Sequence, residues 1–353
     1  MRGMDVDQNE MFFYGSLDER VRADHPLRPL REMCNRALRQ LSPKFDELYS
    51  PLGRESVPPE QLIRALLLQA LYSVRSERQL MDRLELDLLF RWFVGLGGSE
   101  PAWDATVFSK NRDRLLEGEI AQEFFQAVLG QAREKDLLSS EHFSVDGTLL
   151  EAWASKKSYG KKQEPPEQGS GARGRKLLRD THESATDPDA KMYRKSTGGA
   201  FQLCHMAHVL MENRNGIPVA GKVTEAKNSA EWEAGLEMLQ AMAEASSQRI
   251  TVGADSAYDY AVFTEAARDL RVTPHVAQHQ LRSSSIDGRT TRHDGYEISL
   301  KKRRWIEPIF GWVKNVAMQR QVRHRGRALV QWNFLLALSG YVLVRMRNLA
   351  AAA

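Results

Sequence analysis

The chain has 353 residues, of which 42% are hydrophobic and 27% charged, and a formal net charge of +4, which places it among ordinary globular proteins with one large domain or two. Its two cysteines, Cys34 and Cys204, form no Cys-X-X-Cys pair, which argues against a disulfide-rich secreted protein or a cysteine-based zinc site and favours a reducing cytoplasm. Residues 1–21 carry charges throughout, so we expect no signal peptide.

The first part of the chain is predicted to be all helical. Residues 1–55 show no clear pattern, but beyond them apolar residues recur at helical spacing. Ser76 and Asp104 are suited to cap two further helices, and a strongly apolar helix follows them. We therefore predict a helical domain over residues 1–138. A DNA-binding helix-turn-helix module and a packing or dimerisation module both fit this succession of helices.

Residues 139–350 are predicted to form a mixed α/β sheet flanked by helices. Short β-prone runs alternate with helical segments, and the turn Asn213–Gly216 joins two of the runs in a hairpin. A helix capped by Asn228 and Glu231 is expected after the hairpin. The expected strands are 142–149, 202–211, 217–223, 249–255 and 272–277, and two further helices are expected at 260–270 and 299–316.

Two other segments of this part have a distinctive composition. Residues 155–199 are polar and basic, and we predict a flexible insertion that is mobile without DNA and becomes partly ordered when DNA binds. The most apolar run, residues 328–344, is shorter than a membrane span and contains Gln331, Asn333 and Ser339. We therefore predict a buried C-terminal helix at about 328–347 and no membrane partner.

The helix expected at 299–316 has an unusual distribution of charge, and Pro308 indicates that it either begins near Arg304 or is kinked there. Offsets of four and seven residues place Arg303, Glu307 and Lys314 on nearly the same side. Glu307 is the only acid among nine basic residues between Lys301 and Arg327, and such a concentration of cations indicates a polyanionic partner. A simple ion pair between Glu307 and Arg303 on a solvated face is the alternative.

Three acids are candidates for chemistry. Asp146 and Asp255 each stand where a predicted strand ends, and Glu307 stands on a helix that could pack across the sheet. Ligand sites collect at strand ends of α/β sheets. Three converging carboxylates would repel one another unless a divalent cation lay among them, and carboxylate oxygens suit Mg²⁺. Two such ions can promote cleavage of a phosphodiester.

The sequence resembles the DDE transposases of bacterial insertion sequences. The matching residues are Val-Asp-Gly-Thr around Asp146, the Thr-Asp-Pro-Asp-Ala run at 186–190, Val-Gly-Ala-Asp ending at Asp255, and Pro-His-Val-Ala-Gln at 274–278. The most specific match is the arginine, glutamate and lysine spacing over 303–314. The resemblance extends from about residue 20 to 345 and implies a ribonuclease-H-like catalytic domain behind a helical N-terminal domain.

The resemblance also implies roles for individual residues. Asp146, Asp255 and Glu307 would be the metal-binding triad for two Mg²⁺ ions, with Mn²⁺ as a substitute. Arg303 and Lys314 would contact DNA phosphates. Leu300 and Ser256 depart from the residues that many relatives carry, a tyrosine and a lysine, which leaves the neighbouring DNA contacts open. Further DNA-binding candidates on the same segment are Lys301, Lys302, Arg304 and Trp312.

The function expected from these observations is DNA transposition. The protein would bind the terminal inverted repeats of its element, cut the ends, and join the freed 3′-hydroxyl to target DNA, acting in the bacterial cytoplasm as a homo-oligomer on DNA. A metal-dependent nuclease without strand transfer and a catalytically inactive repressor of the element are the alternatives.

Several other residues have plainer interpretations. Core packing is the default role for Trp312 and for its neighbour Trp305. Sheet packing is favoured over a zinc site for His205 and His208, and a turn is favoured for the acids that flank Pro188.

Overall fold

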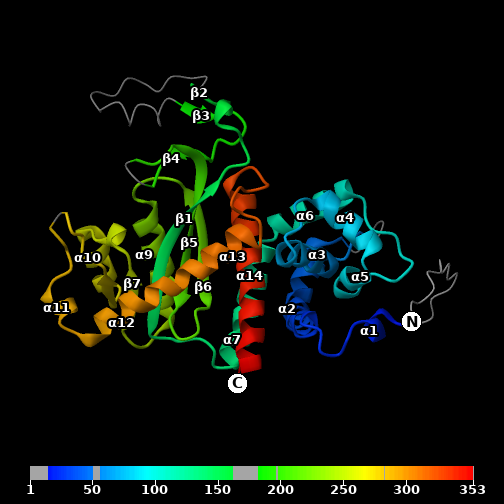
Figure 1. Ribbon diagram of the computed structural model, residues 1–353, viewed down its shortest axis with the longest axis horizontal. Coiled ribbons are helices and arrows are strands. Elements are labelled where there is room, and N and C mark those ends of the chain that lie inside the picture. The colour runs from blue at the N-terminus through cyan, green and yellow to red at the C-terminus, as the bar shows by residue number, and fades with distance from the viewer. Residues whose placement is uncertain (1–14, 51–55, 162–181, 196–197, 282, 353) are drawn as a thin grey trace, which may run out of the picture.

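A computed structural model describes residues 15–50, 56–161, 182–195, 198–281 and 283–352. A β-sheet with helices on both faces forms one half of the molecule, and a group of N-terminal helices packs beside it, beyond the long last helix (Figure 1). This arrangement is the α/β class with a helical N-terminal part that the sequence predicts.

The N-terminal part consists of helices whose starts follow capping chemistry. The Asp104 carboxylate accepts a hydrogen bond from Thr106 N at 2.8 Å, and the Ser76 hydroxyl accepts one from Gln79 N at 3.2 Å. The longest of these helices lies in the region that showed no clear pattern, where Pro43 interrupts the helical signal. The helices are α1 (Leu17–Arg20), α2 (Leu27–Leu48), α3 (Pro59–Leu71), α4 (Glu77–Leu86), α5 (Leu88–Val94), α6 (Ala105–Glu117) and α7 (Ile120–Glu134).

The central sheet combines antiparallel and parallel pairing. Its strands are β1 (His142–Glu151), β4 (Lys191–Tyr193), β5 (Gln202–Glu212), β6 (Pro218–Glu225), β7 (Ile250–Ala254) and β8 (Val272–Val276). They lie in the order β4-β5-β1-β7-β8, with β6 also paired to β5. Strands β1, β5 and β6 are antiparallel, whereas β7 and β8 continue the sheet parallel to β1. This is the strand arrangement of a ribonuclease-H-like fold, so the predicted fold class is confirmed.

Different helices cover the two faces of the sheet. Strand residues alternate between faces: Val145 of β1 lies in the core beneath α9 and α10, whereas Leu150 lies in the core shared with α14. The segment 299–316 is not one continuous helix. A 3₁₀ turn at Arg304–Ile306 divides it, because Pro308 favours a new helix start. The helices are α9 (Ala230–Ala245), α10 (Ala261–Asp269), α11 (Gly288–Thr291), α12 (Asp294–Arg303), α13 (Glu307–Asn315) and α14 (Arg327–Ala352).

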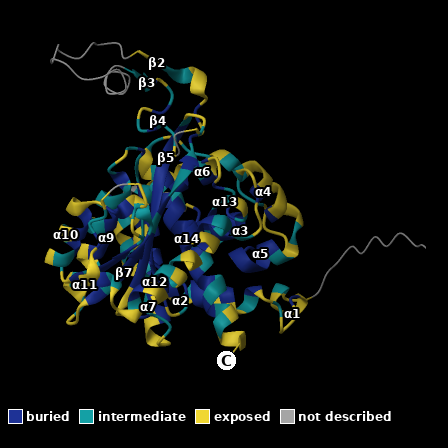
Figure 2. Cartoon of the chain, turned by 60° about the vertical axis from the view of Figure 1, so that its left-hand side comes forward, coloured by how far each residue is buried: buried dark blue, intermediate teal, exposed yellow. Residues whose placement is uncertain are grey.

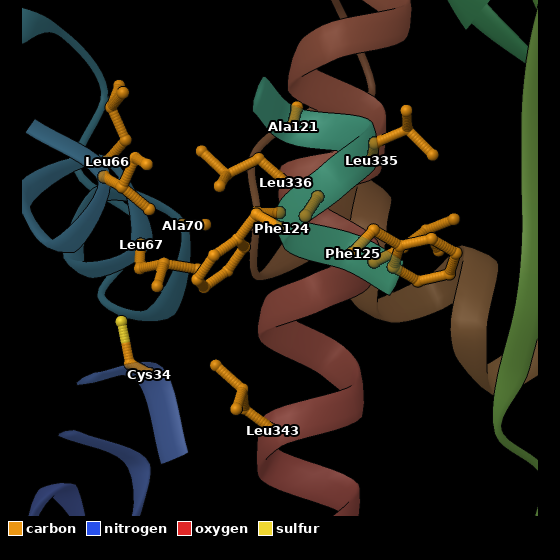
Figure 3. Close-up of a cluster of buried hydrophobic side chains, with 14 of the residues drawn as sticks. Cys34, Leu66, Leu67, Ala70, Ala121, Phe124, Phe125, Leu335, Leu336 and Leu343 are labelled. Carbon is orange, nitrogen blue, oxygen red and sulfur yellow. The ribbon is translucent and has the colours of Figure 1, made fainter. Parts of the chain in front are cut away.

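One hydrophobic core joins the N-terminal helices to the sheet through α14. Figure 3 shows Phe124 and Phe125 of α7 beside Leu335 and Leu336 of α14, with side chains of α2 and α3 across from them. Burial of each such side chain contributes about 1.5–3 kcal/mol. The expected domain boundary at residue 138 falls between α7 and β1, but this core extends across it.

The long last helix is a central packing element of the fold. Within the described chain, α14 is the one helix that is long and apolar enough to cross a membrane, by length and composition. In its most apolar stretch, 67% is buried inside the protein. Figure 2 shows it enclosed by the sheet and the N-terminal helices. It is therefore the buried C-terminal helix predicted from its composition.

The segment expected to be a flexible insertion, 155–199, has β structure at both ends. Strands β2 (Tyr159–Lys161) and β3 (His182–Ser184) pair as a small separate sheet, and β4 joins the central sheet. The middle of the segment, residues 162–181, lies outside the described residues, as do residues 196–197.

Candidate active site

Two of the predicted acids lie near the point where the pairing of β1 with β7 stops. Asp255 directly follows β7, as predicted, but Asp146 lies in the middle of β1 and not at its end, because antiparallel pairing with β5 continues the strand to Glu151. Ser144 of β1 is paired with Gly253 of β7, and the same register carried two residues further places Asp146 opposite Asp255. Neighbouring strands are about 4.8 Å apart. Both residues are half-buried, so the two acids share one confined region beside the C-terminal end of β7.

Each carboxylate is oriented by a nearby backbone N–H. Asp146 Oδ1 accepts a hydrogen bond from Gly147 N at 2.7 Å, and Asp255 Oδ1 accepts one from Ala257 N at 2.9 Å. Burial raises the pKa of the Asp146 carboxyl above its ordinary value. The Lys195 ammonium opposes this shift, the Asp255 carboxylate adds to it, and Arg303 opposes it more weakly.

A lysine and a glutamate not identified from the sequence complete the charged cluster. Lys195 Nζ donates a hydrogen bond to the Gly147 carbonyl oxygen at 2.9 Å and lies 3.5 Å from Glu231 Oε1 of α9. Burial raises the pKa of the Glu231 carboxyl, which Asp255 and Asp146 raise further. Burial alone would lower the pKa of the Lys195 ammonium, but the surrounding carboxylates outweigh it and raise that pKa.

Little in the sequence indicated that Lys195 and Glu231 belong to the site. Glu231 was interpreted as part of a capping box with Asn228, whereas the N-cap of α9 is Ser229, without a side-chain cap bond. Lys195 was counted within the insertion. The preceding Thr-Asp-Pro-Asp-Ala run was the one available indication that this stretch has a defined structure.

The segment from α12 to α13 crosses the same face of the sheet that carries Asp146. Gly253 abuts the Ser299 carbonyl of α12, and Lys314 Nζ of α13 donates a hydrogen bond to Thr148 Oγ1 at 2.6 Å. Thr148 and Asp146 are two residues apart on β1 and therefore point to the same face. In Figure 1 the two helices run obliquely across β1.

Glu307 lies on this crossing segment between the two cations. Arg303 before it acts electrostatically on Asp146, and Lys314 after it contacts β1. Glu307 itself is exposed, and within the described chain no ion pair joins it to Arg303. The solvated ion pair offered as an alternative is therefore absent there, while its place as the third metal ligand stays a prediction.

The remaining DNA-binding candidates have different surroundings. Lys301 and Arg304 are exposed, and Lys302 Nζ lies 3.6 Å from the centroid of the Trp305 ring. Trp305 is itself exposed, so the core-packing role expected for it is wrong. Trp312 instead packs against α14, where its ring is 5.9 Å from the ring of Tyr341. This position favours the packing role for Trp312 over a DNA contact.

The acids that flank Pro188 bind the segment before β4 to the start of α14. Asp187 is fully buried, lies 3.1 Å from His205 Nε2, and accepts a hydrogen bond from Gly326 N at 3.2 Å. Asp189 accepts one from Arg327 N at 2.8 Å. These carboxylates thus satisfy N–H groups where α14 begins.

The two aspartates fit a divalent cation. Their oxygens are the hard ligands that Mg²⁺ prefers, and their mutual repulsion is the condition that a cation relieves. Both carboxylates raise the pKa of the Lys195 ammonium. Across the described residues no group of three or more His, Cys, Asp or Glu side chains is placed to hold a metal ion, so the triad stays a prediction.

Residues 138–343 match the family described as "Transposase DDE domain", and residues 15–114 match the one described as "Transposase domain (DUF772)". Among solved structures, the piggyBac transposase synaptic complex with hairpin DNA is 8% identical and covers 93% of this chain and 76% of that chain, with a TM-score of 0.41. The Mos1 transposase paired-end complex with left transposon end is 13% identical. It covers 81% of this chain and 86% of that chain, with a TM-score of 0.21. No curated protein matches the chain.

Proposed function

Because this chain belongs to the DDE transposase family, whose domain match covers more than half of it, we propose that it binds the terminal inverted repeats of a bacterial insertion sequence, cleaves the DNA ends and joins the freed 3′-hydroxyl to target DNA. The observation that carries the proposal is the register of β1 and β7, which brings Asp146 opposite Asp255. We further propose that the protein acts in the cytoplasm, on DNA and as a homo-oligomer.

In this proposal Asp146, Asp255 and Glu307 would hold two Mg²⁺ ions, or Mn²⁺ in their place. Such ions, when bound, would activate the attacking oxygen and stabilise the leaving oxygen of a phosphodiester. Asp146 and Asp255 are supplied by neighbouring strands and already oriented by the Gly147 and Ala257 N–H groups. Glu307 would come from the facing helix α13, whose Lys314 contacts Thr148 of β1.

The chain's own cations would position the DNA. Arg303 and Lys314 lie on either side of Glu307 along the segment that crosses β1, so a phosphate backbone near the acids would meet both. The exposed Lys301 and Arg304 would extend the same basic path, with Lys302 beside them. Phosphate contacts of this kind fix register and orientation without reading the base sequence.

A strand-transfer assay with labelled terminal-repeat DNA, unlabelled target DNA and Mg²⁺ tests the function. We expect nicked ends followed by joined products. Nicking without joined products would identify a nuclease, and binding without nicking would identify a repressor of the element.

We predict that Arg303→Ala and Lys314→Ala will each weaken DNA binding about equally for terminal-repeat and unrelated duplexes. The slope of log binding constant against log salt should fall by about 0.9 per lost phosphate contact. Filter binding or fluorescence anisotropy at several salt concentrations measures this slope. Arg289→Ala, which removes an exposed arginine paired with Asp287, is the matched control. An unchanged slope in the first two variants would remove both residues from the DNA path.

A further inference from the structure

Lys195 is an exposed lysine whose charge is nevertheless directed into the acid site. Half of its side chain is accessible to solvent, yet its ammonium bonds the carbonyl of Gly147, the residue that directly follows Asp146. The side chain of its partner Glu231 is only 14% accessible. A solvated lysine gains freedom by extending into water, so this inward position indicates a specific attraction.

Carboxylates from three separate elements supply that attraction. They are Asp146 of β1, Asp255 after β7 and Glu231 of α9, and all three raise the pKa of the Lys195 ammonium. Arg303 of α12 also acts on Asp146, more weakly than Lys195. Lys195 is therefore the principal counter-charge of the acid cluster.

The fold fixes the start of the Lys195 side chain. Two residues earlier, β4 ends where Tyr193 is in register with Gln202 of β5. The stretch before β4 is held by the buried contact of Asp187 with His205 and by its bond to the start of α14. Lys195 is thus presented from an anchored segment.

The glycine next to Asp146 allows the partner of Lys195 to approach. A Cβ atom on Gly147 would lie 3.1 Å from Glu231 Cγ and 3.0 Å from His208 Nδ1, closer than side-chain atoms normally pack. With glycine there, the Glu231 carboxylate reaches β1 and holds the ammonium against the strand.

We propose that Lys195, retained by Glu231 and by the Gly147 carbonyl, is the resident counter-cation of the acid site in the metal-free protein, and that divalent ions must displace it in order to bind. This inference rests on the proposed function, since it assumes that Asp146 and Asp255 are metal ligands. A divalent ion between these carboxylates would repel the ammonium strongly at so short a range. Before metal binds, the lysine would offset the repulsion between the two aspartates. It would also raise the metal concentration that is needed to fill the site.

Mn²⁺ binding to the full-length protein without DNA tests this inference. We expect Lys195→Met to bind Mn²⁺ several-fold more tightly than the natural protein, because no cation has to be displaced. The same variant should melt at a lower temperature without metal and show a larger rise in melting temperature when Mn²⁺ is added. Lys195→Arg, which keeps the charge, should behave like the natural protein.

The matched control is Lys191→Met, four residues earlier in the same segment. Lys191 donates a hydrogen bond to the Pro188 carbonyl and lies 3.8 Å from Glu225, away from the acids, so its loss should leave Mn²⁺ affinity unchanged. In a Glu231→Gln background the gain in Mn²⁺ affinity from Lys195→Met should be smaller, because the partner that holds Lys195 at the site has been removed.

Two failures can be told apart. If Asp146→Asn abolishes Mn²⁺ binding but Lys195→Met binds no more tightly than the natural protein, the counter-cation inference is overturned while the metal site stands. If the natural protein and Asp146→Asn bind Mn²⁺ equally, the metal site of the proposed function fails and this inference fails with it.

Discussion

Replacing Asp146, Asp255 or Glu307 singly by the neutral amide should reduce Mg²⁺-dependent cleavage of terminal-repeat DNA by about a thousandfold or more in each variant. Residues that act as one unit lose nearly all activity when any member is removed, so the three losses should be similar. DNA binding should be retained or slightly strengthened, because phosphate contacts come from other residues and one negative charge has gone.

The fold should survive these changes for a reason visible at Asp146. Burial and the Asp255 carboxylate raise the pKa of Asp146, which means that its ionised form destabilises the metal-free folded state. Asn removes that charge at nearly the same volume. Melting temperatures measured without metal should therefore be unchanged or higher.

Glu297→Gln is the control for these variants, since it removes an exposed carboxylate of α12 outside the acid site. It should cleave like the natural protein. Terminal-repeat binding and nicking are measured side by side on all four variants. If Glu307→Gln still cuts while both aspartate variants fail, α13 serves DNA binding alone and the third ligand lies elsewhere.

Leu343→Ala should lower the free energy of unfolding by about 2–5 kcal/mol, the range for removing a leucine from a packed core. Leu343 is fully buried on α14 and faces the N-terminal helices (Figure 3). Because the core extends from those helices through α14 to the sheet, we expect one cooperative transition that shifts as a whole. Urea denaturation followed by circular dichroism measures the change.

The same substitution at Leu86, whose exposed fraction is 83%, should change the free energy of unfolding by less than about 0.5 kcal/mol. A loss below 1 kcal/mol at Leu343 would contradict the close packing of α14 against the N-terminal helices. Two separate transitions would show that the parts on either side of residue 138 unfold independently.

Short-range patterns in the sequence were enough for several features of this protein. The apolar runs that lead to Asp146 and Asp255 are strands, because alternating and β-branched residues favour extended backbone, although β1 continues past Asp146 to Glu151. Helical periodicity predicted Arg303 and Lys314 on one face of a helix. The structure places them on α12 and α13, and both act on residues of β1. The α/β fold class followed from the order of such elements.

Short-range patterns were not enough where a proline interrupts a helix or where the apolar spacing is weak. A helix through Pro43 was not expected, and its buried side chains became interpretable only when α7 and α14 were packed against them. Pro308 permits either a kink or a new helix start, and the structure has a 3₁₀ turn at Arg304–Ile306 followed by a new helix from Glu307. For Trp312, helical spacing allowed both packing and DNA contact, and its proximity to Tyr341 of α14 favours packing.

The charged surroundings of the acids were decided by tertiary structure alone. Asp146 meets Asp255 through the register between β1 and β7, and Lys195 and Glu231 arrive from the end of β4 and the first turn of α9. Local propensity carries no information on which distant segments pair, since that depends on the burial of whole faces and on strand register. The sequence by itself therefore determined that the segments carrying these acids and cations are strands and helices. Only the folded chain brought a lysine among the carboxylates, because charges attract at short distances in space regardless of their separation along the chain.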